Sequence, residues 1–119
     1  MRQTIILDLP TGASSAGNGD YKLLPPNISG ESHVHVGGIW GNTEQMKVQY
    51  CSDTRFSEDD AWTDAAGGAI AGVTSTWVKQ TETIPAEALA VRIVTIDDIT
   101  PDSTYPPIAR WIYDEGAPS

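Results

Sequence analysis

Two histidines, His33 and His35, are the side chains best suited to metal chemistry in this sequence. Because the side chains of a strand alternate between its faces, both imidazoles would lie on one face. A protein metal site needs a third ligand and usually a fourth. The chain has no other histidine, its one cysteine is Cys51, and residues 37–41 supply no carboxylate. We therefore expect two solvent-exposed strand histidines and no bound metal.

The densest group of carboxylates is the run Ser57-Glu58-Asp59-Asp60, with Asp53 before it and Asp64 after it. Carboxylate oxygens of this kind bind Ca²⁺, but the run lacks the alternating carboxylates and the central glycine of an EF-hand loop. A solvated turn or a short helix within Ser57–Ala66 is the better interpretation. Ser57 would then be the N-cap, and the acidic residues would complement the helix N-terminus.

The sequence shows no pattern of residues that predicts catalysis. Neither histidine has a nucleophile paired with it by motif, and no Gly-x-Ser-x-Gly turn occurs. The glycines Gly37-Gly38-x-x-Gly41 lack the lysine and the helix of a phosphate-binding loop. A pair of glycosidase-like carboxylates could exist, but nothing singles one out. We predict a non-enzymatic protein that needs no cofactor.

The four tryptophans of the chain permit two interpretations. They are Trp40, Trp62, Trp77 and Trp111. Exposed tryptophans can form a flat platform on which sugars stack, and Trp40 and Trp62 are the candidates for ligand-facing aromatics. Tryptophans beside or within strands more often fill a sandwich core or a subunit interface. The sequence alone favours the core or interface.

Charge and composition exclude several classes of partner. The net charge is −9, and the seven basic residues are dispersed along the chain. Nucleic-acid binding needs clustered cations, so we expect no nucleic acid as a partner, and acidity argues against anionic membranes as well. No apolar run is long enough for a signal peptide or a membrane span, so we expect a protein that stays where it is made. A single cysteine forms no internal disulfide.

Short apolar runs separated by glycine and proline are typical of strands joined by turns. Glu44–Tyr50 alternates most clearly, and we expect its Met46, Val48 and Tyr50 to face the core together with Val91 and Ile93. Without long helices between the strands, the pattern predicts one all-β domain over residues 1–119, an antiparallel sandwich or barrel. Of the two, we expect an antiparallel β-sandwich of about eight strands. Residues 1–20 could include an extended N-terminal arm or loop. The expected strands are Thr4–Leu7, Tyr21–Leu24, Ser32–Ile39, Glu44–Tyr50, Trp77–Ile84, Leu89–Ile96 and Ile108–Tyr113.

One series of landmarks spans about half of the chain. It runs through Gly38-Ile39-Trp40-Gly41, Val48-Gln49-Tyr50-Cys51-Ser52-Asp53, Trp62-Thr63-Asp64, Thr81-Glu82-Thr83-Ile84-Pro85 and Val91-Arg92-Ile93-Val94-Thr95. This order resembles small virion proteins of tailed bacteriophages, several of which are jelly-roll sandwiches that decorate or cement capsids. The resemblance implies a jelly roll and a structural role on the capsid exterior, with assembly in the host cytoplasm.

The resemblance also implies a set of partners. A decoration protein would bind the lattice of the major capsid protein and stabilise it, and it would associate with itself as a dimer or trimer. Tyr21, Tyr105, Pro106 and Pro107 are the candidate capsid or protomer contacts. The alternatives are a head or tail fibre, an adaptor, or a carbohydrate-binding module. Binding of glycans by the isolated protein would favour the alternatives, and hundreds of copies per particle would favour decoration.

Overall fold

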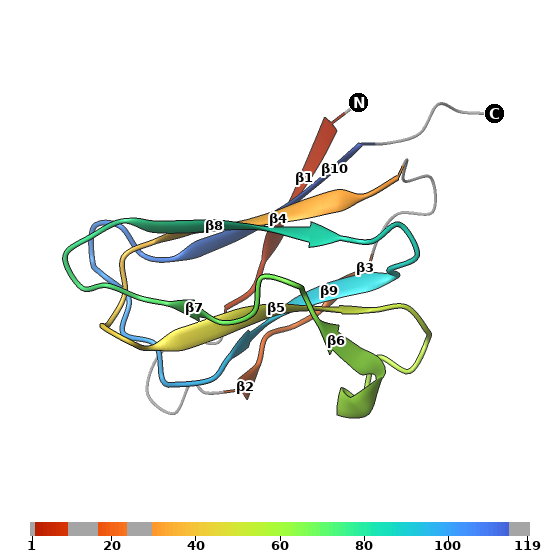
Figure 1. The fold of residues 1–119 in the computed structure, drawn as a ribbon, viewed down its shortest axis with the longest axis horizontal. Helices are drawn as coiled ribbons and strands as arrows, with labels where there is room; N and C mark the ends of the chain where they lie inside the picture. The colour runs from red at the N-terminus through yellow and green to blue at the C-terminus, as the bar shows by residue number, and fades with distance from the viewer. Residues whose placement is uncertain (1, 10–16, 24–29, 115–119) are drawn as a thin grey trace.

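The protein is a sandwich of two antiparallel β-sheets in a computed structural model that describes residues 2–9, 17–23 and 30–114 (Figure 1). The first sheet has the order β1-β10-β4-β8, and its strands are Arg2–Leu7, Ile108–Asp114, Ser32–Gly38 and Val78–Ile84. The second sheet is built on β9 (Ala90–Thr95) and β5 (Gln45–Cys51). Four short strands complete it: β2 (Gly17–Asn18), β3 (Lys22–Leu23), β6 (Trp62–Asp64) and β7 (Ile70–Ala71).

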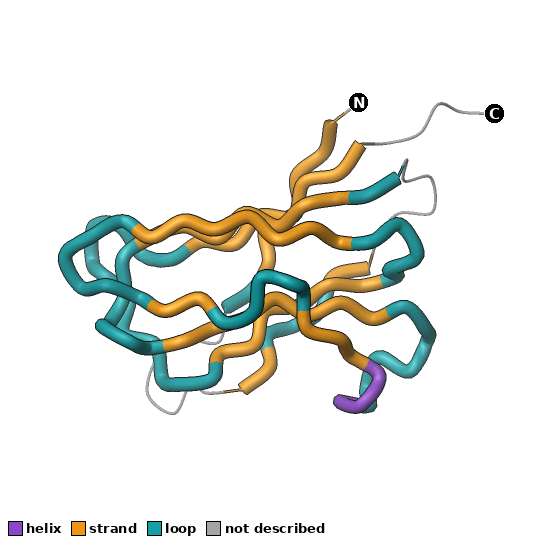
Figure 2. Tube along the Cα trace, in the orientation of Figure 1, coloured by secondary structure: helices purple, strands orange, loops and turns teal. Residues whose placement is uncertain are grey.

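The order of the strands is that of a jelly roll. Strands β2 and β3 both pair with β9, and β6 and β7 both pair with β5, so the second sheet also has four strand positions. The chain passes between the two sheets at most of its connections, as the two layers of Figure 2 show. This confirms the predicted antiparallel sandwich of about eight strand positions. Strand β1 pairs with β10, which is distant in sequence, and forms one edge of the first sheet.

The core lies between the sheets and is filled from alternate positions of the long strands. Val34 and Val36 point inward from β4, and Ala109 and Trp111 point inward from β10. The indole N–H of Trp111 donates to Ser32 Oγ at 2.7 Å, which satisfies the only polar atom of this side chain. The predicted core residues Met46, Val48, Val91 and Ile93 are fully buried, and Tyr50 is half-buried against the same cluster.

The N-terminal segment and the acidic run each depart from expectation in one respect. Residues 2–7 form β1 and residues 17–18 form β2, so those parts of the possible arm belong to the sheets; residues 10–16 lie outside the described residues. The turn or short helix expected within Ser57–Ala66 is present as a single 3-10 turn, Asp59–Ala61, but its N-cap is Glu58, without a side-chain bond, and not Ser57. The chain then pairs Trp62 with Cys51 as a strand, because this places the indole against the sheet.

Candidate functional site

The outer face of the sheet β1-β10-β4-β8 carries the side chains that the alternation of these strands turns to solvent. His33 and His35 point outward from β4, as the sequence predicted. Across the strands, His35 is in register with Arg110 of β10 and with Thr81 of β8. Thr81 Oγ1 and His35 Nδ1 lie 3.0 Å apart and share a hydrogen bond. Imidazole, hydroxyl and guanidinium groups therefore meet in one row across three strands.

A groove of about 540 Å³ lies along this row. Its lining includes Gly37, Trp77, Lys79 and Arg110. The indole of Trp77 lies close to Gly37, since a Cβ built there would be 3.3 Å from Trp77 Nε1. Trp77 is nevertheless 50 % exposed, and it contacts the ring of Tyr105 edge-on at 5.7 Å between centroids. The groove thus offers an aromatic surface beside polar donors.

The two cations of the groove differ from the other basic residues of the chain. Five of the seven lysines and arginines form ion pairs with carboxylates, from Lys47 with Asp64 at 3.1 Å to Arg2 with Asp114 at 3.9 Å. Lys79 and Arg110 have no such partner among the described residues. In a chain with a net charge of −9, the available positive charge is therefore gathered at this groove.

A second, apolar hollow of about 270 Å³ adjoins the groove at Ile108. Ile6, Leu9, Pro101 and Pro106 line it as well, and Ile6 and Ile108 are among the large apolar side chains that are exposed. We call the exposed residues Ile6, Tyr105, Pro106 and Ile108 the apolar patch. Two predicted contact residues, Tyr105 and Pro106, belong to it. Another of the four, Pro107, lines the hollow but is buried.

Trp40 does not face a ligand. Only 1 % of this residue is exposed, and its indole N–H donates to the carbonyl oxygen of Glu44 at 2.8 Å. The segment that contains Gly41 and Glu44 and the segment around Gly72 meet here, because Gly72 N donates to Glu44 O at 2.9 Å. The ring therefore closes one end of the core, which is the interpretation that the sequence favoured, and the alternative of a ligand-facing Trp40 does not hold.

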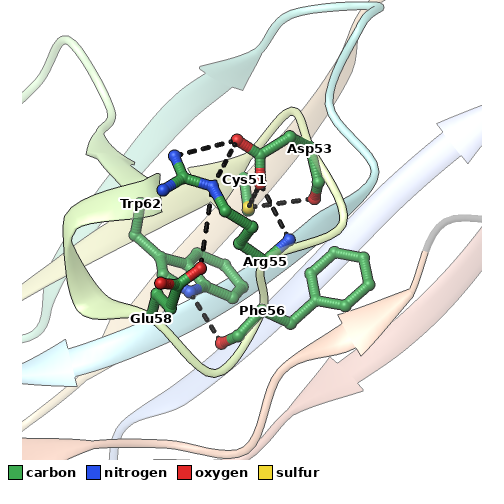
Figure 3. Close-up of polar contacts among 6 residues, drawn as sticks. All are labelled: Cys51, Asp53, Arg55, Phe56, Glu58 and Trp62. Atoms are coloured by element: carbon green, nitrogen blue, oxygen red, sulfur yellow. Dashed lines mark hydrogen bonds and ion pairs between the residues drawn. The ribbon is translucent and has the colours of Figure 1, made fainter.

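Trp62 is also internal to the protein, on the outer side of the second sheet. It is 7 % exposed, and its N–H donates to the carbonyl oxygen of Phe56 at 3.1 Å (Figure 3). The guanidinium of Arg92 lies 4.3 Å above its ring. The ring of Tyr21 stacks on Phe56 at 5.1 Å and lies 5.9 Å from Trp62. These aromatic residues hold a loop against the sheet, so Trp62 is a packed residue, as the sequence favoured, and the alternative of a ligand-facing Trp62 does not hold; Tyr21 keeps an exposed edge.

The acidic loop satisfies its own carboxylates. Asp53 Oδ1 accepts a hydrogen bond from the backbone N–H of Arg55 at 2.8 Å, which lowers the pKa of Asp53, and the Arg55 side chain adds an ion pair at 3.2 Å (Figure 3). Arg55 also lies 3.7 Å from Glu58, and Cys51 Sγ donates to the carbonyl oxygen of Asp53. Among the described residues, no three His, Cys, Asp or Glu side chains gather as a metal site would require.

Comparisons with known proteins identify no family for this chain. No protein-family model matches the chain, and no curated protein sequence does. Among solved structures, the chain is similar to the K1 cleaved adhesin domain of Lys-gingipain from Porphyromonas gingivalis W83. The two share 15 % sequence identity at a TM-score of 0.47, over 97 % of this chain and 73 % of that one. In the described part of the chain, no helix has the length and apolar character to cross a membrane.

Sequence reasoning missed the groove. It did not single out Trp77 among the four tryptophans as ligand-facing, and it treated Lys79 and Arg110 as dispersed charges. One local signal was available: Trp77, Lys79 and Thr81 are alternate residues of the expected strand Trp77–Ile84, so they were expected to face the same side. The partner strands that bring Arg110 and His35 alongside are set by long-range pairing, which the sequence pattern does not contain.

Proposed function

We propose that this jelly roll is a non-catalytic attachment module of a bacteriophage virion, of the capsid decoration type. The observation that carries the proposal is the apolar patch of Ile6, Tyr105, Pro106 and Ile108 at one end of the first sheet. Exposed apolar surface of this kind, bordered by polar residues, marks sites of protein association. It coincides with the segment that the resemblance to virion proteins implied as a capsid contact.

Such a module acts through linkage rather than chemistry. A protein that binds only the assembled lattice stabilises it by about 2.7 kcal/mol per site at a hundredfold excess over Kd. Each contact needs on the order of 1,200–2,000 Å² of buried surface in total. Self-association as a dimer or trimer would engage several sites at once and raise the avidity. The acidic surface away from the groove would limit direct contact with packaged DNA.

The test compares particles that contain the protein with particles from which its gene has been deleted. We expect hundreds of copies per particle and a lower temperature of DNA release after deletion. Adding back the Ile6→Asp variant should fail to restore the release temperature, because the carboxylate is placed in the apolar patch at a residue that does not line the groove. Ile96→Asp is the matched control, since Ile96 is an exposed isoleucine directly after β9, outside the patch. Equal release temperatures, together with a handful of copies, would overturn the proposal.

A second candidate function, a carbohydrate-binding module, is favoured by the groove itself. A volume of this order accepts a small ligand. The exposed indole of Trp77 offers a ring on which a sugar can stack, and Thr81 and His35 offer hydrogen bonds to hydroxyl groups. The groove and the apolar hollow share Ile108, but Trp77 lines only the groove and Ile6 only the hollow, so substitutions at these two residues can disrupt glycan binding and capsid attachment separately.

A further inference from the structure

We propose that the groove between Trp77 and Arg110 binds a carboxylated sugar, with Arg110 and Lys79 holding its carboxylate. This inference rests on the second candidate function, glycan binding, and names the class of sugar. It requires three things of the site: available positive charge, a surface for the sugar ring, and a reason to prefer a sugar over an acidic peptide.

The charge of the groove is the first argument. Arg110 and Lys79 are the two basic residues of the chain that have no ion pair with a described carboxylate, while five others do. They extend from β10 and β8, which lie on either side of β4. Two strand spacings separate these strands by about 10 Å, a gap that two long side chains can span toward one ligand. An anion placed between them gains two charge-assisted hydrogen-bond donors.

The ring surface is the second argument. Gly37 is in register with Lys79 on one side and with Ile108 on the other, and the indole of Trp77 lies where a side chain on Gly37 would otherwise stand. Trp77 lines the groove and is half exposed. The C–H face of a pyranose can pack on such an indole while its hydroxyl groups reach outward. Thr81 Oγ1 and the imidazole of His35 are placed beside it as hydrogen-bonding groups for those hydroxyls.

The backbone of β4 is the third argument. Strand β4 pairs with β10 along one edge and with β8 along the other, so its N–H and C=O groups are already used. An extended peptide laid over the face would find no free backbone partners for its own amides, which peptide recognition by sheets normally supplies. A sugar needs only side-chain donors and acceptors. The groove therefore favours a carboxylated sugar over an acidic peptide.

Calorimetric titration with two carboxylated probes, tetragalacturonate and sialyllactose, tests the inference. Each is compared with its methyl ester, and hexa-aspartate serves as the acidic peptide. We expect at least one acidic sugar to bind about tenfold more tightly than its ester, and to bind more weakly as salt is raised. Arg110→Met and Trp77→Ala should each weaken binding about tenfold or more. Arg110→Lys should restore only part of the loss, because lysine lacks the bidentate geometry.

Arg2→Met is the matched control, because it removes the same charge from the far end of the same sheet and should leave the affinity unchanged. Equal affinity for acid and ester would overturn the carboxylate assignment while glycan binding stood. Failure of both sugars and both esters to bind would overturn the glycan function as well. Tighter binding of hexa-aspartate than of either sugar would overturn the assignment in favour of a peptide. None of these results alters the release temperature of particles, which tests the decoration proposal separately.

Discussion

Each outer face of the sandwich carries an arginine near a tryptophan. On the second sheet, the side chain of Arg92 is 7 % exposed, lies over Trp62, and donates from Nε to Gln49 Oε1 at 2.9 Å. On the first sheet, Arg110 and Trp77 line opposite parts of an open groove and are exposed. The same two residue types are thus used in two ways.

The difference arises from the connections that follow the strands. Between β5 and β6, the chain folds back over the second sheet, and Asp59 of that segment reaches Arg92 at 3.5 Å. The carboxylate of Asp64 then joins the same polar network through Gln49, at 2.8 Å. On the first sheet, no described segment brings a carboxylate to Arg110 or Lys79. A polar group satisfied within the fold contributes stability, and one left available can contribute binding.

The largest expected contrast is between the two tryptophans. Trp62→Ala should lower the free energy of unfolding by about 3–5 kcal/mol, because it removes a buried ring and leaves a cavity beneath Arg92. Trp77→Ala should lower it by less than about 1 kcal/mol, since half of that residue is already in water. Urea denaturation followed by circular dichroism measures both. Equal losses would show that the groove tryptophan is part of the folding core.

The two arginines should show the same contrast in stability as the two tryptophans, with smaller losses. Arg92→Met should cost about 2 kcal/mol, because the amide of Gln49 and the face of Trp62 lose a charged partner. Arg110→Met should change the stability by less than about 0.5 kcal/mol. The ligand titration should rank the two variants in the opposite order. A variant pair that ranks the same way in both measurements would contradict the division of roles between the faces.

The sequence could predict those elements whose pattern lies within one continuous segment. Glu44–Tyr50 alternates over seven residues, so its strand and its inward side chains Met46 and Val48 were readable. Strands β2, β6 and β7 have only two or three residues, too few to show a period, and the sequence did not predict them. They exist because β9 and β5 offer edges with which to pair.

The candidate site was harder to predict from the sequence than the fold. Whether a tryptophan beside a strand is buried depends on which segment covers it, and that segment is distant in sequence. Trp40 is covered where Gly72 approaches Glu44, and Trp62 is covered by Arg92 and Tyr21. Trp77 has the edge of Tyr105 beside it and remains open. The pairing of charges is equally non-local, so the sequence does not show that Lys79 and Arg110 lack ion pairs with described carboxylates.

The smallest expected effect concerns Asp64, at the exposed end of the network on the second sheet. Gln49 Nε2 donates to Oδ1 at 2.8 Å and Lys47 Nζ to Oδ2 at 3.1 Å, and these bonds hold the pKa of Asp64 below its usual value. A carboxyl group with a lowered folded-state pKa stabilises the fold above its unfolded-state pKa, about 4, and this stabilisation is lost as the pH falls through the folded-state value. Asp64→Asn should therefore be less stable than the wild type at pH 7, by under about 1 kcal/mol because the pair is half exposed.

The pH dependence separates this charge effect from a packing effect. As the pH falls through the lowered folded-state pKa of Asp64, the carboxyl of the wild type becomes protonated, so its stability and that of the Asn variant should converge. Asp20→Asn is the control, since Asp20 is exposed and has no hydrogen bond to a described residue; its effect should be near zero at both pH values. Urea titrations at pH 7, 4 and 2.5 measure the difference. A gap between wild type and Asp64→Asn that stays constant with pH would mean that the loss comes from the shape of the amide in the network. The second sheet would then depend on fit rather than on charge, and the contrast with the cations of the groove would no longer be electrostatic.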